Sequence, residues 1–134
     1  MAPEAATVLV VDDDADILSL VEFALASEGF VVKLAANGRE ALDRLTDGLP
    51  DLILLDMKMP ILSGWEFARE YRDLYDHAVP IVVLTAAEDA SRRAAEIGAE
   101  GWVGKPFDLD NLLGVVRQHT AKRGPRASSP TEAG

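Results

Sequence analysis

The sequence contains no cysteine among its 134 residues. Disulfide bonds, thiolate catalysis and cysteine-ligated zinc are therefore excluded. Basic residues are also few, because 13 Lys and Arg stand against 23 Asp and Glu, which gives a formal net charge of −10. This balance argues against direct binding to nucleic acid or to an anionic membrane surface, since both require clustered positive charge.

Long apolar runs and a secretory signal are missing as well. No run approaches the roughly 18 apolar residues that a membrane span requires. The opening residues MAPEAAT lack the basic and then apolar pattern of a signal peptide. We therefore expect a soluble cytoplasmic protein, and 134 residues are enough for one domain with a single hydrophobic core.

Five short apolar stretches have the composition of β-strands. Three are continuous runs, namely TVLVV at 7–11, DLILL at 51–55 and PIVVL at 80–84. Continuous runs of this length are typical of strands that are buried on both faces of a parallel sheet. The other two predicted strands are FVVKLA at 30–35 and the weaker GWVG at 101–104.

Amphipathic segments separate these strands, each with its apolar residues on one helical face. We expect helices over 16–28, 37–47, 63–75, 88–97 and 108–120. Ser63 followed by Glu66 has the pattern of a capping box. Asp108 is the expected N-cap of the last helix, and either Asp14 or Asp16 can cap the first.

The alternation of strand and helix favours a doubly wound α/β domain of the flavodoxin-like (βα)5 type. Such a domain has a five-stranded parallel sheet, which we expect in the order 2-1-3-4-5. We predict that the domain covers residues 6–121 and follows an N-terminal extension, residues 1–5. The stretch KRGPRASSPTEAG at 122–134 has no apolar periodicity, and we predict a disordered C-terminal tail.

Polar side chains stand where four of the five predicted strands end. Asp12 and Asp13 follow the first strand, and Asp56 follows the third. Thr85 follows the fourth strand and Lys105 the fifth. In open parallel sheets, ligands bind at the carboxyl ends of the strands where the strand order reverses, which here lies between strands 1 and 3. We therefore expect the three carboxylates to meet in one cleft, with Thr85 and Lys105 beside them.

Three clustered carboxylates need a counterion. Two of them about 4 Å apart repel by about 4 kcal/mol at an effective dielectric constant of about 20. An all-oxygen site suits Mg²⁺, with Mn²⁺ as an alternative ion, rather than zinc or copper. A carboxylate can also act as a nucleophile toward phosphorus, and phosphoryl transfer mainly requires positioning and charge neutralisation.

The motifs together resemble the receiver domain of two-component response regulators. They are VLVVDDD at the first strand, LILLDMKMPILSG at the third, VVLTA at the fourth and KPF at the fifth, and the resemblance spans roughly residues 6–121. The resemblance implies that Asp56 is the phosphoacceptor and that Asp13 binds Mg²⁺ directly. It further implies that Asp12 acts on the metal largely through water and that the Lys58 carbonyl completes the protein ligands.

The same resemblance assigns roles to the ends of the last two strands. Thr85 becomes the switch hydroxyl, the Ala86 backbone helps to hold the phosphoryl group, and Lys105 pairs with it. Trp102 stands at the aromatic switch position, where the family usually has Tyr or Phe. It either switches or simply packs in the core. The Lys105–Pro106 bond is expected to be cis.

A family member of this kind works in a phosphorelay. The resemblance implies a phosphoryl donor that is a sensor histidine kinase or a histidine phosphotransfer protein, and a switching face made by the fourth helix, fifth strand and fifth helix. We expect a stand-alone receiver that controls a protein partner or passes the phosphoryl group on, as a monomer or a phosphorylation-dependent dimer. It would assist its own phosphorylation and dephosphorylation, but it would not be a conventional enzyme.

Lys58 raises a separate hypothesis, because it lies two residues after the expected phosphoacceptor. Its side chain either points to solvent or leans over the site and alters the phosphoryl lifetime. An unchanged hydrolysis rate in Lys58→Ala would rule out the second interpretation.

Three other classes of protein share parts of this pattern. A haloacid-dehalogenase-type phosphatase would use Asp12 and Asp14 as its Asp-x-Asp motif, but it leaves Asp56 unexplained. A calcium loop fails, since its sixth position requires glycine and holds Ile17, and its twelfth holds Phe23. A pseudo-receiver that only binds proteins would not need every residue of the site.

Overall fold

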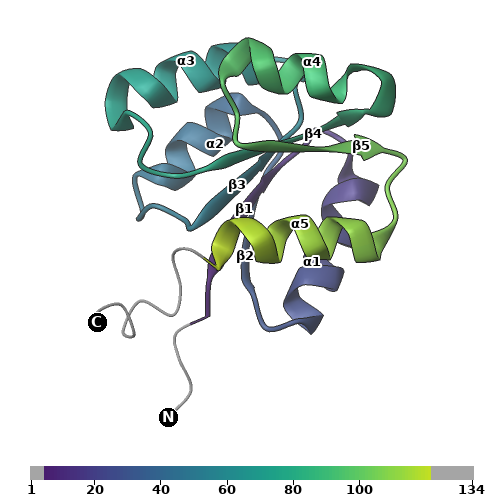
Figure 1. Ribbon diagram of the computed structural model, residues 1–134. Coiled ribbons are helices and arrows are strands. Elements are labelled where there is room, and N and C mark those ends of the chain that lie inside the picture. Colours follow the sequence, from purple (N-terminus) through teal and green to yellow (C-terminus); the bar gives the residue numbers. More distant parts are fainter. Residues whose placement is uncertain (1–4, 122–134) are drawn as a thin grey trace, which may run out of the picture.

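A computed structural model describes residues 5–121 of the chain (Figure 1). The five strands are β1 (Thr7–Val11), β2 (Val31–Ala35), β3 (Leu52–Leu55), β4 (Ile81–Ala86) and β5 (Gly101–Lys105). The five helices are α1 (Ala15–Ser27), α2 (Gly38–Leu45), α3 (Gly64–Tyr75), α4 (Ala87–Ile97) and α5 (Leu109–Thr120). Residues 1–4 of the predicted extension 1–5 and the predicted tail at 122–134 lie outside the described residues.

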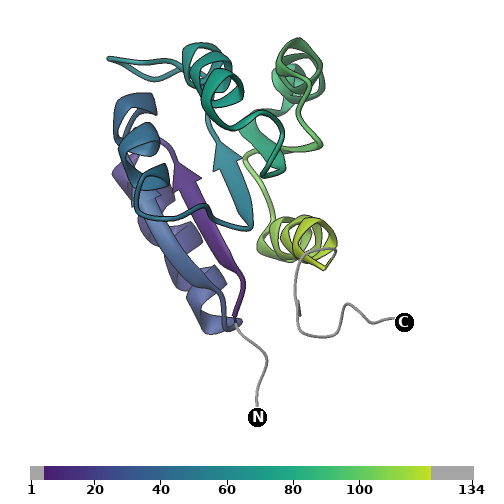
Figure 2. The same ribbon diagram turned by 90° about the vertical axis from the view of Figure 1, so that its left-hand side faces the viewer.

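The strands form one parallel sheet in the order β2-β1-β3-β4-β5, which confirms the predicted topology. Helices α1 and α5 cover one face of the sheet, and α2, α3 and α4 cover the other. Helices α3 and α4 lie side by side in both views (Figures 1 and 2). Strands β1 and β3 are fully buried except for Thr7, as their continuous apolar runs predict.

Side-chain caps begin four of the five helices. The Asp14 carboxylate accepts from the backbone N–H groups of Asp16 and Ile17, and Asp108 caps α5 in the same way. Ser63 forms the predicted capping box with Glu66 at the start of α3. Helix α4 is the exception among these five, because its N-cap residue is Ala86 and no side chain caps it.

The end of β4 differs from the sequence prediction. The apolar run predicts a strand that stops at residue 84, but β4 continues through Thr85 and Ala86. These two residues pair with Gly104 and Lys105 of β5, so the ladder extends the strand. Helix α4 then begins directly at Ala87 with no connecting loop.

Candidate phosphoacceptor site

The carboxyl ends of β1 and β3 bring three carboxyl groups together. One oxygen from each of Asp12, Asp13 and Asp56 lies within 4.8 Å of the others. Asp12 and Asp56 are buried, whereas Asp13 is exposed. The register explains this placement, since Val11 pairs with Leu55 and the next residue of each strand carries a carboxylate. The cluster is therefore a product of the 2-1-3 strand order.

Lys105 reaches into this cluster from the end of β5. Its Nζ lies 2.7 Å from Asp12 Oδ2 and 3.7 Å from Asp56 Oδ1. The other oxygen of Asp12 accepts a hydrogen bond of 3.0 Å from the Asp14 backbone N–H. Each oxygen of Asp12 thus has a partner within the protein, and one ammonium lies near both buried carboxylates.

The environment of Asp56 raises the pKa of its carboxyl group. Burial, followed by the negative charge of Asp12, raises the pKa of Asp56 to about 6. The Lys105 ammonium and the Met57 backbone N–H lower the pKa, but they do not outweigh these two causes. Keeping Asp56 ionised at neutral pH therefore costs free energy, which a bound cation would offset.

The loop after β3 folds tightly around Asp56, and glycine makes this closure possible. The Gly64 N–H donates to the Met57 carbonyl at 2.8 Å. A Cβ atom on Gly64 would lie only 2.7 Å from the Asp56 carbonyl oxygen and from Met57 Cα. Gly64 thus lets the loop close against the backbone of Asp56 and Met57. The Lys58 side chain is exposed and forms no hydrogen bond or ion pair with residues 5–121, so it points to solvent here.

Thr85, Ala86 and Lys105 lie together because β4 and β5 pair through their last residues. Thr85 is buried near the carboxyl end of β4. Sequence reasoning missed Gly104, whose Cβ would lie 2.6 Å from Ala87 Cα. The sequence feature that could have indicated this role is the position of Gly104 directly before the Lys105–Pro106 pair. The close approach seats the start of α4 on β5, beside Thr85 and Lys105.

Trp102 lies on β5 with 52% of its surface exposed. Its neighbours Gly101 and Val103 are buried, because β5 alternates at the edge of the sheet. The interpretation of Trp102 as plain core packing is therefore wrong. The Lys105–Pro106 peptide bond is cis, as expected.

Asp14 does not join the cluster as a second catalytic acid. Its Oδ1 is used to cap α1, at 2.9 Å from the Asp16 nitrogen and 3.3 Å from the Ile17 nitrogen. An Asp-x-Asp phosphatase site would need this carboxylate for chemistry. The geometry therefore speaks against the phosphatase alternative.

Comparison with known families identifies the domain. The family model described as "Response regulator receiver domain" matches residues 8–117. The chain belongs to the response regulator receiver domains. Receiver domains act in two-component signalling, and they generally use Mg²⁺ bound in an acidic pocket of the kind formed by Asp12, Asp13 and Asp56. The family membership also settles the choice against the phosphatase fold.

Curated relatives include transcription regulators from mycobacteria. The chain is 41% identical over 127 residues to the transcriptional regulatory protein PrrA of Mycobacterium tuberculosis, covering 93% of this chain and 54% of that protein. It is 42% identical over 112 residues to the response regulator MprA of Mycolicibacterium vanbaalenii, covering 82% of this chain and 48% of that protein. The receiver domain described here thus spans about half the length of the curated relatives it matches.

Solved structures agree with this assignment over nearly their full lengths. The chemotaxis protein CheY4 of Vibrio cholerae matches with a TM-score of 0.78 at 34% identity, covering 86% of this chain and 98% of CheY4. A putative response regulator from Chloroflexus aurantiacus matches with a TM-score of 0.80 at 33% identity, covering 88% and 99%. Among residues 5–121, no helix combines the length and apolar character needed to cross a bilayer.

Proposed function

We propose that Asp56 of this receiver domain accepts a phosphoryl group from a phosphohistidine. The observation that carries the proposal is the convergence of three carboxylates at the switch point of the sheet, where Lys105 lies beside two of them, Asp12 and Asp56. The donor would be a sensor histidine kinase or a histidine phosphotransfer protein, which implies a cytoplasmic location. The domain would assist its own phosphorylation and dephosphorylation without being a conventional enzyme.

The residues of the site suit this transfer. An Asp56 carboxylate oxygen forms a bond to phosphorus while the bond from phosphorus to the donor's imidazole nitrogen breaks, and the imidazole leaves with that electron pair. The Lys105 ammonium, 3.7 Å from Asp56, would pair with the transferred group. The Thr85 hydroxyl and the Ala86 backbone N–H would donate hydrogen bonds to its oxygens.

The three carboxylates also fit a divalent cation. Their ligand atoms are all oxygen, they lie within 4.8 Å of one another, and Asp12 and Asp56 repel each other in a buried setting. We infer that Asp13 and Asp56 would hold Mg²⁺ directly, with the Lys58 carbonyl, and that Asp12 would act largely through water. When bound, the ion neutralises negative charge on the phosphoryl oxygens.

The output would come from the face formed by α4, β5 and α5. Thr85 would move toward the phosphoryl group, and Trp102, half-exposed on β5, would change its environment. We propose a protein partner or a further phosphotransfer step as the target, since the net charge of −10 disfavours direct contact with DNA. The chain would act as a monomer or as a dimer that forms on phosphorylation.

Intact-mass spectrometry tests the proposal directly. After incubation with acetyl phosphate and Mg²⁺, wild type should gain one phosphoryl group as the phosphorus–oxygen bond of the donor breaks and acetate leaves. The gain should require Mg²⁺ and should vanish in Asp56→Asn, which keeps the shape of the side chain but cannot ionise. A gain that persists in Asp56→Asn would show that another residue accepts the phosphoryl group.

A further inference from the structure

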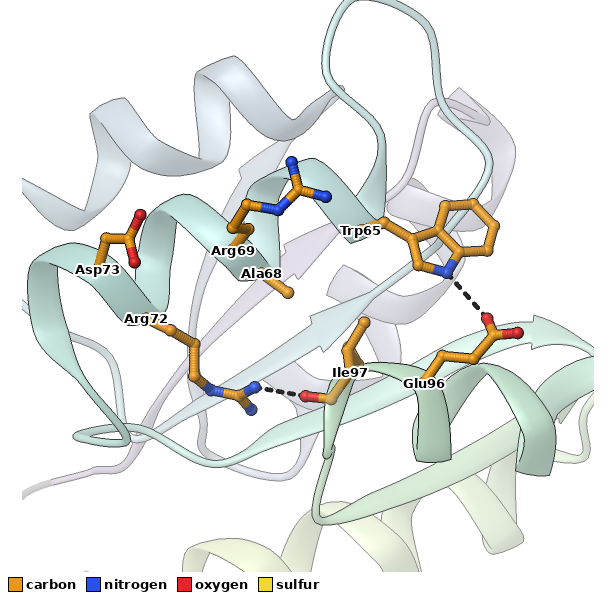
Figure 3. Close-up of a pocket in the computed structure, with 7 residues that line it drawn as sticks. All are labelled: Trp65, Ala68, Arg69, Arg72, Asp73, Glu96 and Ile97. Atoms are coloured by element: carbon orange, nitrogen blue, oxygen red, sulfur yellow. Dashed lines mark hydrogen bonds between the residues drawn. The ribbon is translucent and has the colours of Figure 1, made fainter.

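A groove of about 340 Å³ separates α3 from α4, and polar bridges cross it (Figure 3). It is lined by Trp65, Ala68, Arg69, Arg72, Asp73, Glu96 and Ile97. Two bridges connect the helices. In one, Trp65 of α3 contacts Arg93 and Glu96 of α4, and in the other, Arg72 of α3 contacts backbone carbonyls at the end of α4. We call these four residues the α3–α4 brace. Neither bridge includes a residue of the phosphoacceptor site.

The first bridge is centred on Trp65. Its indole Nε1 donates a hydrogen bond of 2.8 Å to Glu96 Oε1, as Figure 3 shows. The Arg93 guanidinium stacks 5.2 Å from the centre of the Trp65 ring and lies 3.1 Å from Glu96 Oε2. The indole hydrogen bond is the main cause that lowers the pKa of Glu96, so this carboxylate is charged at neutral pH.

The second bridge holds the C-terminal end of α4. Arg72 donates hydrogen bonds to the carbonyl oxygens of Ile97 and Gly98, the latter at 3.3 Å. These carbonyls are among the groups that a helix end leaves without an intrahelical partner, and they carry the negative end of the helix dipole. A guanidinium from the neighbouring helix therefore satisfies and fixes the end of α4.

Helix α4 lies close against β4 and β5 and packs there mainly through small side chains. Its buried residues are Ala90, Ala94 and Ile97, which present a small apolar surface, and no side chain caps its N-terminus. Its first residue, Ala87, packs on Gly104 only two positions after Thr85. A displacement of Thr85 would therefore also displace the start of α4, whereas the brace contacts the C-terminal half of the helix.

The brace is a weak restraint. The Nε atoms of Arg72 and Arg93 are buried without a hydrogen-bond partner within the described residues. A buried donor without a partner lowers the net stability of the contacts around it. Solvent reaches both Arg93 and Glu96, with side chains 17% and 37% exposed, which further limits the strength of their ion pair. Such a restraint can bias an equilibrium without locking it.

We propose that the α3–α4 brace is a regulatory device, which holds α4 in the position described here and opposes the displacement of Thr85 that phosphorylation requires. The proposal rests on the proposed function of Asp56. If only the displaced state accepts the phosphoryl group readily, loosening the brace raises the population of that state and hence the rate of phosphorylation. The device acts on the α3 side of α4 and not through the face that carries Trp102.

Two brace variants and one matched control test this idea in the full chain. Trp65→Phe removes the indole N–H and keeps an aromatic ring, and Arg72→Met removes the guanidinium and keeps an aliphatic stem. Glu70→Gln is the control, because it breaks the 3.7 Å ion pair between Arg39 and Glu70, which joins α3 to α2. Urea unfolding of each variant establishes that the domain remains folded.

The first readout is the rate at which each protein gains one phosphoryl group from acetyl phosphate with Mg²⁺, measured by intact mass. We expect both brace variants to react about two- to tenfold faster than wild type, the range that one net hydrogen bond corresponds to. Glu70→Gln should match wild type. Unchanged or lower rates in both brace variants would overturn the proposal.

The second readout is hydrogen exchange of the backbone amides of residues 87–97 in unphosphorylated protein. Both brace variants should exchange faster there than wild type, while Glu70→Gln should not. Faster exchange with an unchanged phosphorylation rate would overturn the regulatory role. If wild type itself gains no phosphoryl group, the proposed function fails. Unchanged exchange would then show separately that the brace does not hold α4.

Discussion

Helices α3 and α4 are neighbours on the same face of the sheet, but they are attached in opposite ways. Helix α3 begins with a capping box and buries Phe67 and Tyr71 completely. Helix α4 has no side-chain cap, and its deepest residues are Ala90 and Ala94. One helix is anchored by large apolar side chains, whereas the other is held mainly by small ones and by polar bridges.

Tyr71 shows how firmly α3 is fixed. Its hydroxyl donates to the Val79 carbonyl at 2.9 Å and accepts from the Val79 N–H at 2.6 Å, in a buried setting. Its ring stacks between Phe67 and Tyr75 at centroid distances of 6.0 and 5.9 Å. Full burial of a large apolar side chain stabilises a fold by about 1.5–3 kcal/mol, far more than alanine can provide. The comparison shows that large buried side chains anchor α3, whereas small buried side chains and the brace hold α4.

Truncating one buried side chain in each helix should give the largest effect on stability. Phe67→Ala should lower the free energy of unfolding by about 3–5 kcal/mol, because it leaves a cavity under α3. Ile97→Ala, which truncates the largest buried residue of α4 in the same way, should lower it by only about 2 kcal/mol, because Ile97 is 8% exposed at the end of its helix. Urea titration measures both values. Equal losses for the two variants would show that α4 is anchored as firmly as α3.

Asp56, which follows β3, gives the next effect. The pKa of Asp56 is about 6 in the folded protein and close to 3.8 in the unfolded chain, so ionisation of Asp56 destabilises the fold as pH rises between these values. Asp56→Asn removes that penalty. Without divalent cations, the variant should be more stable than wild type by about 3 kcal/mol at pH 7, because each pKa unit between 3.8 and about 6 corresponds to about 1.4 kcal/mol.

The pH dependence distinguishes this cause from a general packing effect. The difference in stability between Asp56→Asn and wild type should be full above pH 6 and should shrink toward zero below pH 3.8. Denaturation in a series of buffers containing a chelator measures it. A difference that stays constant across this pH range would contradict the ionisation account. Added Mg²⁺ should stabilise wild type more than the variant.

Local patterns predicted most of the scaffold, because apolar periodicity and caps depend on residues close in sequence. The alternation of strands and helices, the capping box at Ser63 and the strand order follow from such patterns and from the polar residues at strand ends. The elements that surround α4 could not be predicted in this way. Its start depends on the pairing of Thr85 with Gly104, and its brace joins Trp65 to Glu96, 31 residues away.

The glycines of the site show the same limit. Gly64 and Gly104 lie within a predicted helix and a predicted strand, and their roles come from atoms that approach them in space. The exposure of Trp102 likewise depends on β5 lying at the sheet edge. Residues that act through long-range approach are therefore the ones that sequence reasoning misses.

The smallest predicted effect concerns the loop that leads into α3. Ile61 has a φ of 73° and is 78% exposed, although a β-branched residue is strongly disfavoured in this left-handed region. Ile61→Asn should therefore raise the free energy of unfolding by about 1 kcal/mol, because asparagine tolerates this conformation. Urea titration measures the change, with Leu74→Asn as the control for removing an exposed apolar side chain (Leu74 is 68% exposed in α3). Equal effects in the two variants would mean that the Ile61 backbone is unstrained, and that the loop before α3 is as well settled as the helix itself.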